Sequence, residues 1–398
     1  MRKIVGILVF LLLTFSVLAQ EIIFISGKVT DKKTGEALPF VNVGLVGTYI
    51  GAATNMDGFY ELRISPKYKN KVIEISAVGY STSKVSVVEA AKQKNLNVQL
   101  APMAFEVGEV EILAESRLQY TRVRKAVEAI AKNYLQTPFN YDMYYRGELK
   151  SGENLVRLRE AAVRLYDNKG YKRGDAYQVF KERGYDFLEV RKNFENETLA
   201  DGSTYLDELL EMDIVRVRGN VLNLNELDDY KLKMEGETEY EGDKVWIISY
   251  ENPKPTLAAT GDYYVKTYKG KLYIKQKDYA IVKNTMEVTA TNYSPQGRSF
   301  YVEESRQSYM PLSISYTVTT IYKKHLDYYY LSYVSYQRTH DWHSKSTGDK
   351  KEESISAELL VTKIGTLNPQ VIERRAYYEN KPYNAEFWKT YNIIRDRK

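Results

Sequence analysis

Apolar and polar side chains alternate along residues 23–101, and this period of two predicts half-buried β-strands separated by turns. Val41 and Val43, for example, point to one predicted face of a strand, while the residues beside them point to the other. Asp57 and Gly58 lie between two such alternations, which is a strong signal for a hairpin turn. The first hundred residues therefore predict a small β-domain.

A connecting segment and a helix follow this domain. Residues 102–114 predict a linker without a regular pattern. Ser116 to Leu135 predict an amphipathic helix, because Val123, Val127 and Ile130 recur at helical spacing. Ser116 is the expected N-cap, since a serine hydroxyl accepts hydrogen bonds from the first free backbone N–H groups of a helix.

The remainder of the chain, to residue 398, is β-rich. Only Tyr49, Tyr60, Tyr68 and Tyr80 of the 36 tyrosines come before residue 115, and tyrosine favours strands. Strand-like runs occupy residues 155–166, 244–250, 271–274, 280–289, 312–322, 328–336 and 355–361. A short helix over residues 384–394 is expected to cap an open end of the sheet that these runs form.

The N-terminus has the pattern of a signal peptide over residues 1–19. Arg2 and Lys3 provide a charged start, Ile4 to Phe15 are apolar, and small residues precede a cleavage point before Gln20. The apolar run is too short to span a bilayer, and no later run approaches the necessary length. We therefore expect an exported protein with no transmembrane helix in the mature chain.

Charge and cysteine content narrow the classes of function. The formal charge is +5, from 57 basic and 52 acidic side chains, and like charges never extend beyond adjacent pairs. Nucleic-acid-binding proteins concentrate basic residues on one face, so we expect no nucleic-acid partner. The chain has no cysteine, which excludes disulfides, thiolate metal ligands and lipid attachment through a thiol.

A specific motif begins at Ile25. It consists of I-x-G-x-V-x-D, T-G-E-A-L-P-F-V-N-V and G-A-x-T-N-x-D-G-x-Y-x-L, and it continues through Gly79 and Tyr80 to the strand Leu96 to Leu100. Over most of residues 23–101 this pattern is similar to the carboxypeptidase regulatory-like domain of Bacteroidota envelope proteins. The resemblance implies a seven-stranded, transthyretin-like β-sandwich that acts as an accessory domain and carries no catalytic residues.

Residues 115–398 resemble an uncharacterised family of Bacteroidota envelope proteins associated with the outer membrane. The similarity depends on Tyr144-Tyr145-Arg146, Glu160-Ala161 and the ending Glu386-Phe387-Trp388. The expected fold, a helix on a large curved antiparallel sheet, is also similar to that of periplasmic lipoprotein carriers. The fold class is therefore mainly β, with an N-terminal seven-stranded sandwich and then this α+β domain.

Few residues are candidates for catalysis or metal binding. The histidines are His325, His340 and His343, and none is followed three residues later by the glutamate of a zinc peptidase motif. His340 and His343 would face opposite ways on a strand, and their surroundings suggest a hairpin loop, so no metal site is predicted. No Gly-x-Ser-x-Gly motif or phosphate-binding loop occurs, and no catalytic residue or cofactor is predicted.

Two groups of residues are weaker candidates for ligand contact. On a strand, Glu160 would share a face with Arg164 among apolar neighbours, as an ion pair that is either structural or part of a site. Tyr328, Tyr329 and Tyr330 must place rings on both faces of a strand, so at least one should be exposed. Exposed tyrosine rings can bind sugars or lipids, and packing within the protein is the alternative.

These observations favour a non-enzymatic protein of the periplasm or outer membrane. The sandwich would be an interaction or spacer module. The concave face of the second domain would bind a hydrophobic ligand, a glycan, or a periplasmic or outer-membrane protein. The alternative is an envelope hydrolase with an acid-based site at Glu160 or a metal site at His340 and His343.

Overall fold

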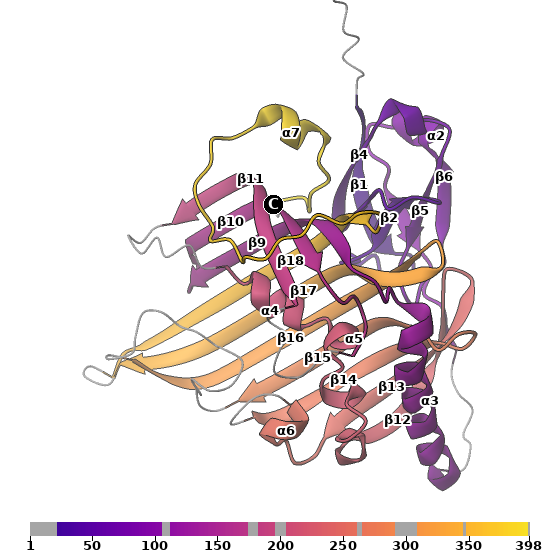
Figure 1. Ribbon diagram of the computed structural model, residues 1–398, viewed down its shortest axis with the longest axis vertical. Coiled ribbons are helices and arrows are strands. Elements are labelled where there is room, and N and C mark those ends of the chain that lie inside the picture. Colours follow the sequence, from indigo (N-terminus) through magenta and orange to yellow (C-terminus); the bar gives the residue numbers. More distant parts are fainter. Residues whose placement is uncertain are drawn as a thin grey trace, which may run out of the picture.

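The chain folds into a small β-sandwich and a large curved sheet that pack against each other (Figure 1). This computed structural model describes residues 22–105, 112–173, 182–195, 204–260, 265–290, 309–344 and 348–396. The predicted signal peptide, residues 1–19, lies outside the described ranges.

The N-terminal domain is a sandwich of seven strands, as the motif implies. One sheet has the order β4-β1-β7 and the other β3-β2-β5-β6. The strands are β1 (Ile23–Asp31), β2 (Asn42–Leu45), β3 (Gly51–Ala53), β4 (Phe59–Ile64), β5 (Val72–Ser76), β6 (Ser83–Ser86) and β7 (Val98–Leu100). Alternate residues of β1 and β4 are buried, which places Ile25, Val29 and Leu62 in the core between the sheets. The short helices η1 (Pro66–Tyr68) and α2 (Val87–Ala91) complete the domain.

Two glycines are required by the backbone of the sandwich. Gly58 has a φ of 77°, and the Asn55 side chain accepts a hydrogen bond from the N–H of Asp57 at 3.0 Å, so the predicted turn is confirmed. Gly27 lies so close to Leu96 that a Cβ would be 1.9 Å from the Leu96 carbonyl oxygen. Only glycine allows β1 to approach the segment before β7 this closely.

The second domain is an antiparallel sheet of eleven strands in the order β11-β10-β9-β18-β17-β16-β15-β14-β13-β12-β8. The strands are β8 (Ala104–Phe105), β9 (Phe139–Ser151), β10 (Asn154–Asp167), β11 (Arg183–Glu195), β12 (Lys231–Tyr240), β13 (Asp243–Asn252), β14 (Val265–Lys275), β15 (Ile281–Ala290), β16 (Tyr309–His325), β17 (Tyr328–Ser344) and β18 (Lys350–Gly365). The expected fold class, mainly β with a sandwich and a large antiparallel sheet, is confirmed.

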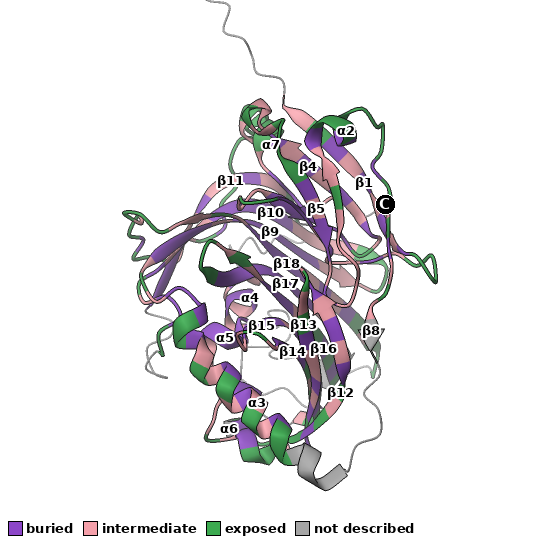
Figure 2. Cartoon of the chain, turned by 90° about the vertical axis from the view of Figure 1, so that its right-hand side faces the viewer, coloured by how far each residue is buried: buried purple, intermediate pink, exposed green. Residues whose placement is uncertain are grey.

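Several helices lie on one side of this sheet, which curves around them (Figures 1 and 2). They are α3 (Ile112–Asn133), α4 (Leu206–Glu211), α5 (Ile214–Val217), η3 (Asn220–Leu222), η4 (Leu227–Asp229) and α6 (Leu257–Thr260). We call the side of the sheet toward these helices the inner face, and the opposite side the outer face.

Tyrosine side chains form much of the core on the inner face. Fully buried tyrosines of this core include Tyr134, Tyr141, Tyr145, Tyr171, Tyr230, Tyr240, Tyr250, Tyr268 and Tyr322. Buried hydroxyls need hydrogen-bond partners, and Tyr134 donates to the Ile281 carbonyl while Tyr230 donates to the Ala259 carbonyl, both at 2.5 Å. The excess of tyrosine after residue 115 therefore reflects, in large part, a core built from aromatic rings.

The segment between the two domains departs from the expected pattern. Part of the predicted linker 102–114 is β8, which pairs Phe105 with Glu237 of β12 and so forms one edge of the large sheet. Helix α3 begins at Ile112, so Ser116 lies inside the helix and the predicted N-cap is wrong. Hydrophobic periodicity locates a helix better than it locates its first turn, because the residues before Ser116 also tolerate helical geometry.

The C-terminal tail lies on the outer face of the sheet. Helix α7 (Ala385–Thr390) is capped by Asn384, whose side chain accepts from the Phe387 N–H at 3.1 Å. Trp388 of this helix is buried against the sheet. The expected terminal helix is thus present but shorter. It covers part of a face, whereas we expected it to cap an open end.

The sandwich also packs on the outer face, beside the tail. Phe40 lies 5.1 Å from Tyr333 of β17, measured between ring centroids, and the Lys323 ammonium of β16 donates to the Asn42 side chain at 2.6 Å. The apolar cluster at this junction comprises Ala53, Tyr144, Ala162, Ile321, Tyr333, Leu360, Trp388, Ile393 and Ile394. The sandwich, tail and sheet therefore share one buried interface.

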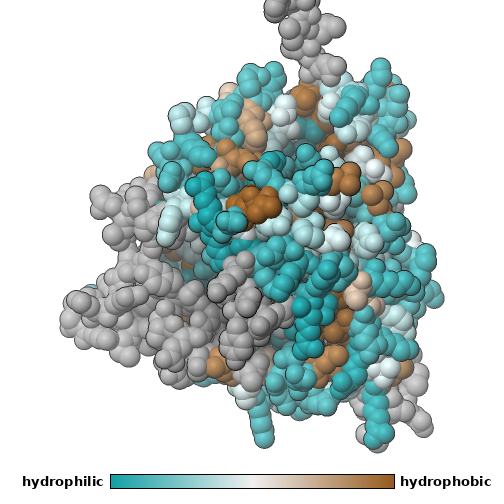
Figure 3. Space-filling view, in the orientation of Figure 1, coloured by the Kyte–Doolittle hydropathy of each residue, from teal (hydrophilic) through white to brown (hydrophobic). Residues whose placement is uncertain are grey.

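Apolar side chains on the surface are mostly scattered. Leu326, Leu367 and Tyr377 are among the most exposed. In the coloured part of the face shown in Figure 3, most residues are hydrophilic and the hydrophobic ones lie in small groups. Among the described residues, no helix has both the length and the apolar character needed to cross a membrane.

Candidate binding groove on the outer face of the large sheet

The outer face changes in chemistry along the strands, because residues two apart on a strand share a face. Nearest the sandwich, five apolar side chains stand in register on neighbouring strands: Ala162, Tyr144, Leu360, Tyr333 and Ile321. Two residues further along, the same strands carry charged groups, among them Glu160, Arg146 and Glu358. Two residues further again, the side chains are polar and line a groove.

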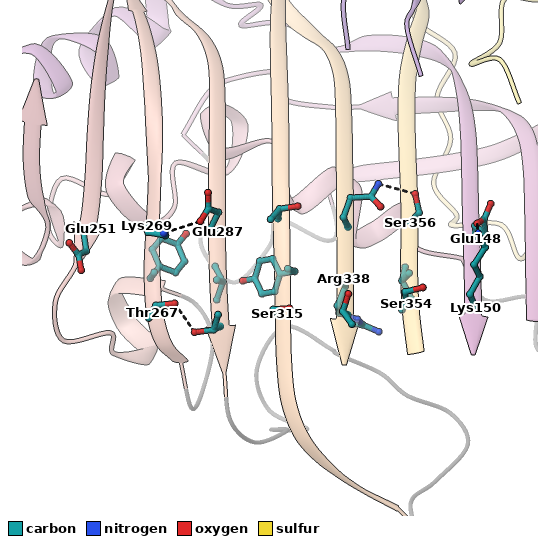
Figure 4. Close-up of a pocket in the computed structure, with 18 residues that line it drawn as sticks. Glu148, Lys150, Glu251, Thr267, Lys269, Glu287, Ser315, Arg338, Ser354 and Ser356 are labelled. Atoms are coloured by element: carbon teal, nitrogen blue, oxygen red, sulfur yellow. Dashed lines mark hydrogen bonds and ion pairs between the residues drawn. The ribbon is translucent and has the colours of Figure 1, made fainter. Parts of the chain in front are cut away.

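The groove has a volume of about 570 Å³ and two parallel rows of side chains on its floor (Figure 4). The first groove row runs through Glu251, Lys269, Glu287, Thr317, Gln337, Ser356 and Glu148. The second groove row runs through Thr267, Thr289, Ser315, Thr339, Ser354 and Lys150. Each pair of neighbours within a row lies in register on adjacent strands.

Opposite charges in the groove are paired with each other. The Lys269 ammonium lies 3.0 Å from the Glu287 carboxylate, and the Lys150 ammonium lies 3.0 Å from the Glu148 carboxylate. Between these pairs, Gln337 donates its amide N–H to the Ser356 hydroxyl at 2.8 Å. The two rows contain three carboxylates and two ammonium groups, so the groove is close to neutral and is dominated by hydroxyls.

Glu160 lies on the outer face between the groove and the apolar side chains beside the sandwich, in a cluster of cations. Its side chain is 0 % exposed, and Arg191 donates to its Oε2. Its Oε1 lies 3.5 Å from Arg146 Nη1 and 3.7 Å from Lys192 Nζ. A carboxylate held this way is surrounded by cations and sealed from solvent, which suits a structural ion cluster.

The C-terminal tail completes the cluster through Asp396. The Asp396 carboxylate lies 2.8 Å from Lys192 Nζ, 3.3 Å from Arg146 Nη1 and 3.4 Å from Arg191 Nη1. Partial burial raises the pKa of Asp396, but the hydrogen bond from Lys192 and the charge of Arg191 outweigh it, so the pKa is below its ordinary value. The tail is thereby held on the sheet by charge as well as by Trp388.

The same chain of contacts reaches the groove. Arg146 Nη2 lies 3.2 Å from the Glu148 carboxylate, which in turn pairs with Lys150. Burial raises the pKa of Glu148, but the hydrogen bond from Lys150 and the charge of Arg146 outweigh this effect. The pKa is therefore below its ordinary value, and Glu148 is ionised at neutral pH. The edge of the groove is therefore fixed by the buried cluster.

The expected pairing of Glu160 with Arg164 is wrong. Arg164 shares the outer face, but its guanidinium bonds Asp142 at 2.6 and 3.0 Å. Arg164 stands opposite Asp142 in the ladder, as Glu160 stands opposite Arg146. Cross-strand neighbours are about 5 Å apart, whereas residues four apart along a strand are about 13 Å apart, so the cross-strand partner forms the ion pair.

Tyr328, Tyr329 and Tyr330 lie at the start of β17, away from the groove. Tyr328 is 43 % exposed, whereas Tyr329 and Tyr330 are 1 % and 2 % exposed and belong to the aromatic core. The Tyr329 hydroxyl donates to Asp278 at 3.0 Å. Of the three, only Tyr328 presents its ring to solvent, which matches the expectation that at least one would be exposed.

His340 and His343 lie on β17 and not in a loop, so that expectation is wrong. The His340 ring is buried on the inner face, and its Nε2 lies 2.8 Å from a Glu353 carboxylate oxygen on β18. His343 stands opposite Lys350 in the ladder. Within the described part of the chain, no three His, Asp or Glu side chains gather as a metal site would require.

A second buried ionic network, on the inner face, was not anticipated from the sequence. Asp167 accepts from Arg183 Nε and Arg216 Nε, each at 2.9 Å. Arg216 also bonds Glu182 at 2.8 Å, and Asp213 accepts from the Tyr322 hydroxyl at 2.8 Å. Because these groups are buried and mutually paired, the network fixes α5 against β10, β11 and β16.

Comparison with known proteins gives the class of the first domain. A two-layer sandwich beside a helix-lined antiparallel sheet, with a polar groove on the outer face of that sheet, defines a mainly β protein. Residues 25–112 match the model of the CarboxypepD_reg-like domain, so this part of the chain is similar to that domain family.

Other matches extend over more of the chain. TonB-dependent receptor P3 from Formosa agariphila is 24 % identical over 155 residues, which are 39 % of this chain and 14 % of that receptor. A LolA superfamily protein from Nitrosomonas europaea aligns with 63 % of this chain and 94 % of its own, at 9 % identity and a TM-score of 0.23. A Bacteroides fragilis protein of unknown function, described as membrane-associated, aligns with 87 % of this chain and 99 % of its own, at 12 % identity and a TM-score of 0.16.

Proposed function

We propose that this chain is a non-catalytic protein of the cell envelope that binds a polar ligand in the outer-face groove. The observation that carries this proposal is the pair of polar rows, which continue across six neighbouring strands and enclose about 570 Å³. That volume falls within the range of roughly 300–1,000 Å³ found for ligand sites. The CarboxypepD_reg-like domain and the receptor similarity support a location in the envelope.

In this proposal the sandwich determines how much of the outer face is open to a ligand. It covers the apolar end of the outer face and leaves the polar end open, so it sets the limit of the groove. A rigid sheet with buried supports holds binding groups in place at little entropic cost when a ligand arrives. We do not propose a hydrolase, because Glu160 is sealed among cations and His340 is buried against Glu353.

A groove-filling variant tests the proposal. Thr317 is exposed in the middle of the first groove row, and a tryptophan there occupies the groove without disturbing the strand, since strands accept aromatic residues. Thr121→Trp, on the exposed side of α3, is the matched control.

Purified protein lacking residues 1–19 is mixed with soluble envelope polysaccharides, an acidic peptide and phospholipid vesicles. We expect at least one polar probe to bind, and to be lost in Thr317→Trp but not in Thr121→Trp. Binding that survives Thr317→Trp, or binding to vesicles alone, contradicts a groove site.

A further inference from the structure

We infer that the groove takes a neutral oligosaccharide in an extended form, lying across the strands along the two groove rows. This inference rests on the proposed function and names its class of ligand. The rows are regular because every member stands in register with the next, on strands that are about 4.8 Å apart. A ligand with a short polar repeat therefore meets a pair of polar groups at each strand.

The groups in the rows suit a ligand rich in hydroxyls. Ser and Thr hydroxyls both donate and accept, and the two rows contain seven of them: Thr267, Thr289, Ser315, Thr317, Thr339, Ser354 and Ser356. Gln337 adds an amide, and Ser315 and Thr317 are exposed at the centre. Sugar hydroxyls also donate and accept, so each can replace the water that such a surface would otherwise hold.

The charges in the groove argue against an ionic polymer. Lys269 is neutralised by Glu287, and Lys150 by Glu148, before any ligand arrives. The remaining carboxylate, Glu251, repels anions such as nucleic acid, acidic glycans and lipid headgroups. A neutral ligand is not repelled by the Glu251 carboxylate, and its binding does not depend on the release of counter-ions.

A peptide is disfavoured by the backbone of the floor. Strands β14 to β18 each pair on both sides, so their N–H and C=O groups are already bonded within the sheet. An extended peptide could not add as a further strand there, and it would bind by side chains alone.

An apolar ligand is disfavoured by the faces of the lining residues. The large lining residues Tyr268, Val288, Tyr316 and Ile355 belong to the inner core, and their side chains point away from the groove. Among the described lining residues, no aromatic ring stands on the outer face. Binding then depends on hydrogen bonds, and we expect dissociation constants from roughly 0.1 to several mM.

The test is calorimetric titration of the protein lacking residues 1–19 with cellohexaose, laminarihexaose and maltohexaose. Cellobiose, polygalacturonate and an acidic decapeptide serve as comparison ligands. We expect one neutral hexasaccharide to bind at least tenfold tighter than its disaccharide, since it reaches more strands. We also expect Thr317→Trp to weaken it at least tenfold, Thr121→Trp to leave it unchanged, and the affinity to be insensitive to salt.

The failures of the two proposals are distinguishable. If only polygalacturonate or the acidic peptide binds, and Thr317→Trp abolishes that binding, the neutral-glycan inference is overturned while a groove site stands. Binding of a neutral hexasaccharide that Thr317→Trp leaves intact overturns both. Absence of heat with all three hexasaccharides at about 10 mM, in a protein that folds normally, overturns the inference for this class of ligand.

Discussion

Replacing Glu160 by glutamine tests whether the buried cluster on the outer face holds the C-terminal tail and the groove edge in place. Glutamine keeps the shape and one acceptor oxygen but removes the charge. Asp396 and Glu148 would then be the carboxylates paired with Arg146, Arg191 and Lys192, and Glu358 would remain opposite Arg146. Glu160 is fully enclosed, and breaking a buried ion pair costs about 3–5 kcal/mol, so we expect the free energy of unfolding to fall by that amount.

Asp396→Asn is the matched control. It removes a carboxylate from the same three cations, but the Asp396 side chain is 43 % exposed, and such pairs contribute about 0–1 kcal/mol. Urea unfolding followed by tryptophan fluorescence gives both values, provided that the slopes of the two variants agree. The loss from Asp396→Asn should shrink in 0.5 M salt, while the loss from Glu160→Gln should persist. Equal, salt-sensitive losses in both variants would show that Glu160 is solvated and refute this account.

Three further predictions concern other parts of the fold. Burial raises the pKa of Glu353, but hydrogen bonds from His340 and Lys351 lower it to about 2. The stability that Glu353 gives over Glu353→Gln, about 3 kcal/mol, should therefore be complete above pH 4.5 and be lost as pH falls through 2, as measured by urea titrations at each pH. Gly27→Ala should reduce the free energy of unfolding by about 1–3 kcal/mol and so lower the melting temperature, because the new Cβ would lie 1.9 Å from the Leu96 oxygen. An unchanged melting temperature would contradict the close approach. Trp388→Ala should reduce the free energy of unfolding by about 3–5 kcal/mol and make the tail susceptible to limited proteolysis. Tyr383→Ala, at an exposed site, should be cleaved at the same rate as the native protein.

The sequence could predict the sandwich in detail because its signals are local. Alternation marks its strands, and Asn55, Asp57 and Gly58 form the expected turn with a positive φ at the glycine. Likewise the helix after residue 112 and the tail helix follow from periodicity, although their ends do not. Each of these features depends on residues within a few positions of one another.

The sites on the large sheet could not be predicted in this way, because they depend on register between strands. Glu160 pairs with Arg146 and Arg191, and the same two cations also hold Asp396, which lies 236 residues from Glu160. The groove left one signal in the sequence: Ser313, Ser315 and Thr317 alternate with buried residues on β16. That pattern indicates a polar face, but only the pairing of six strands turns isolated hydroxyls into two continuous rows.

The length of the central strands leaves room on one sheet for both the sandwich and the proposed ligand site. β16 and β17 each have 17 residues, which corresponds to roughly 55 Å, and the sandwich and tail occupy only one end of that length. A sheet of ordinary strands, about six residues long, would be covered completely and would offer no groove. Because the sandwich packs on the same strands that carry the groove, it cannot move relative to the groove without opening the buried interface between them. We therefore expect ligand binding to leave the angle between the domains unchanged, and the sandwich to position the groove in the envelope and not to open or close it.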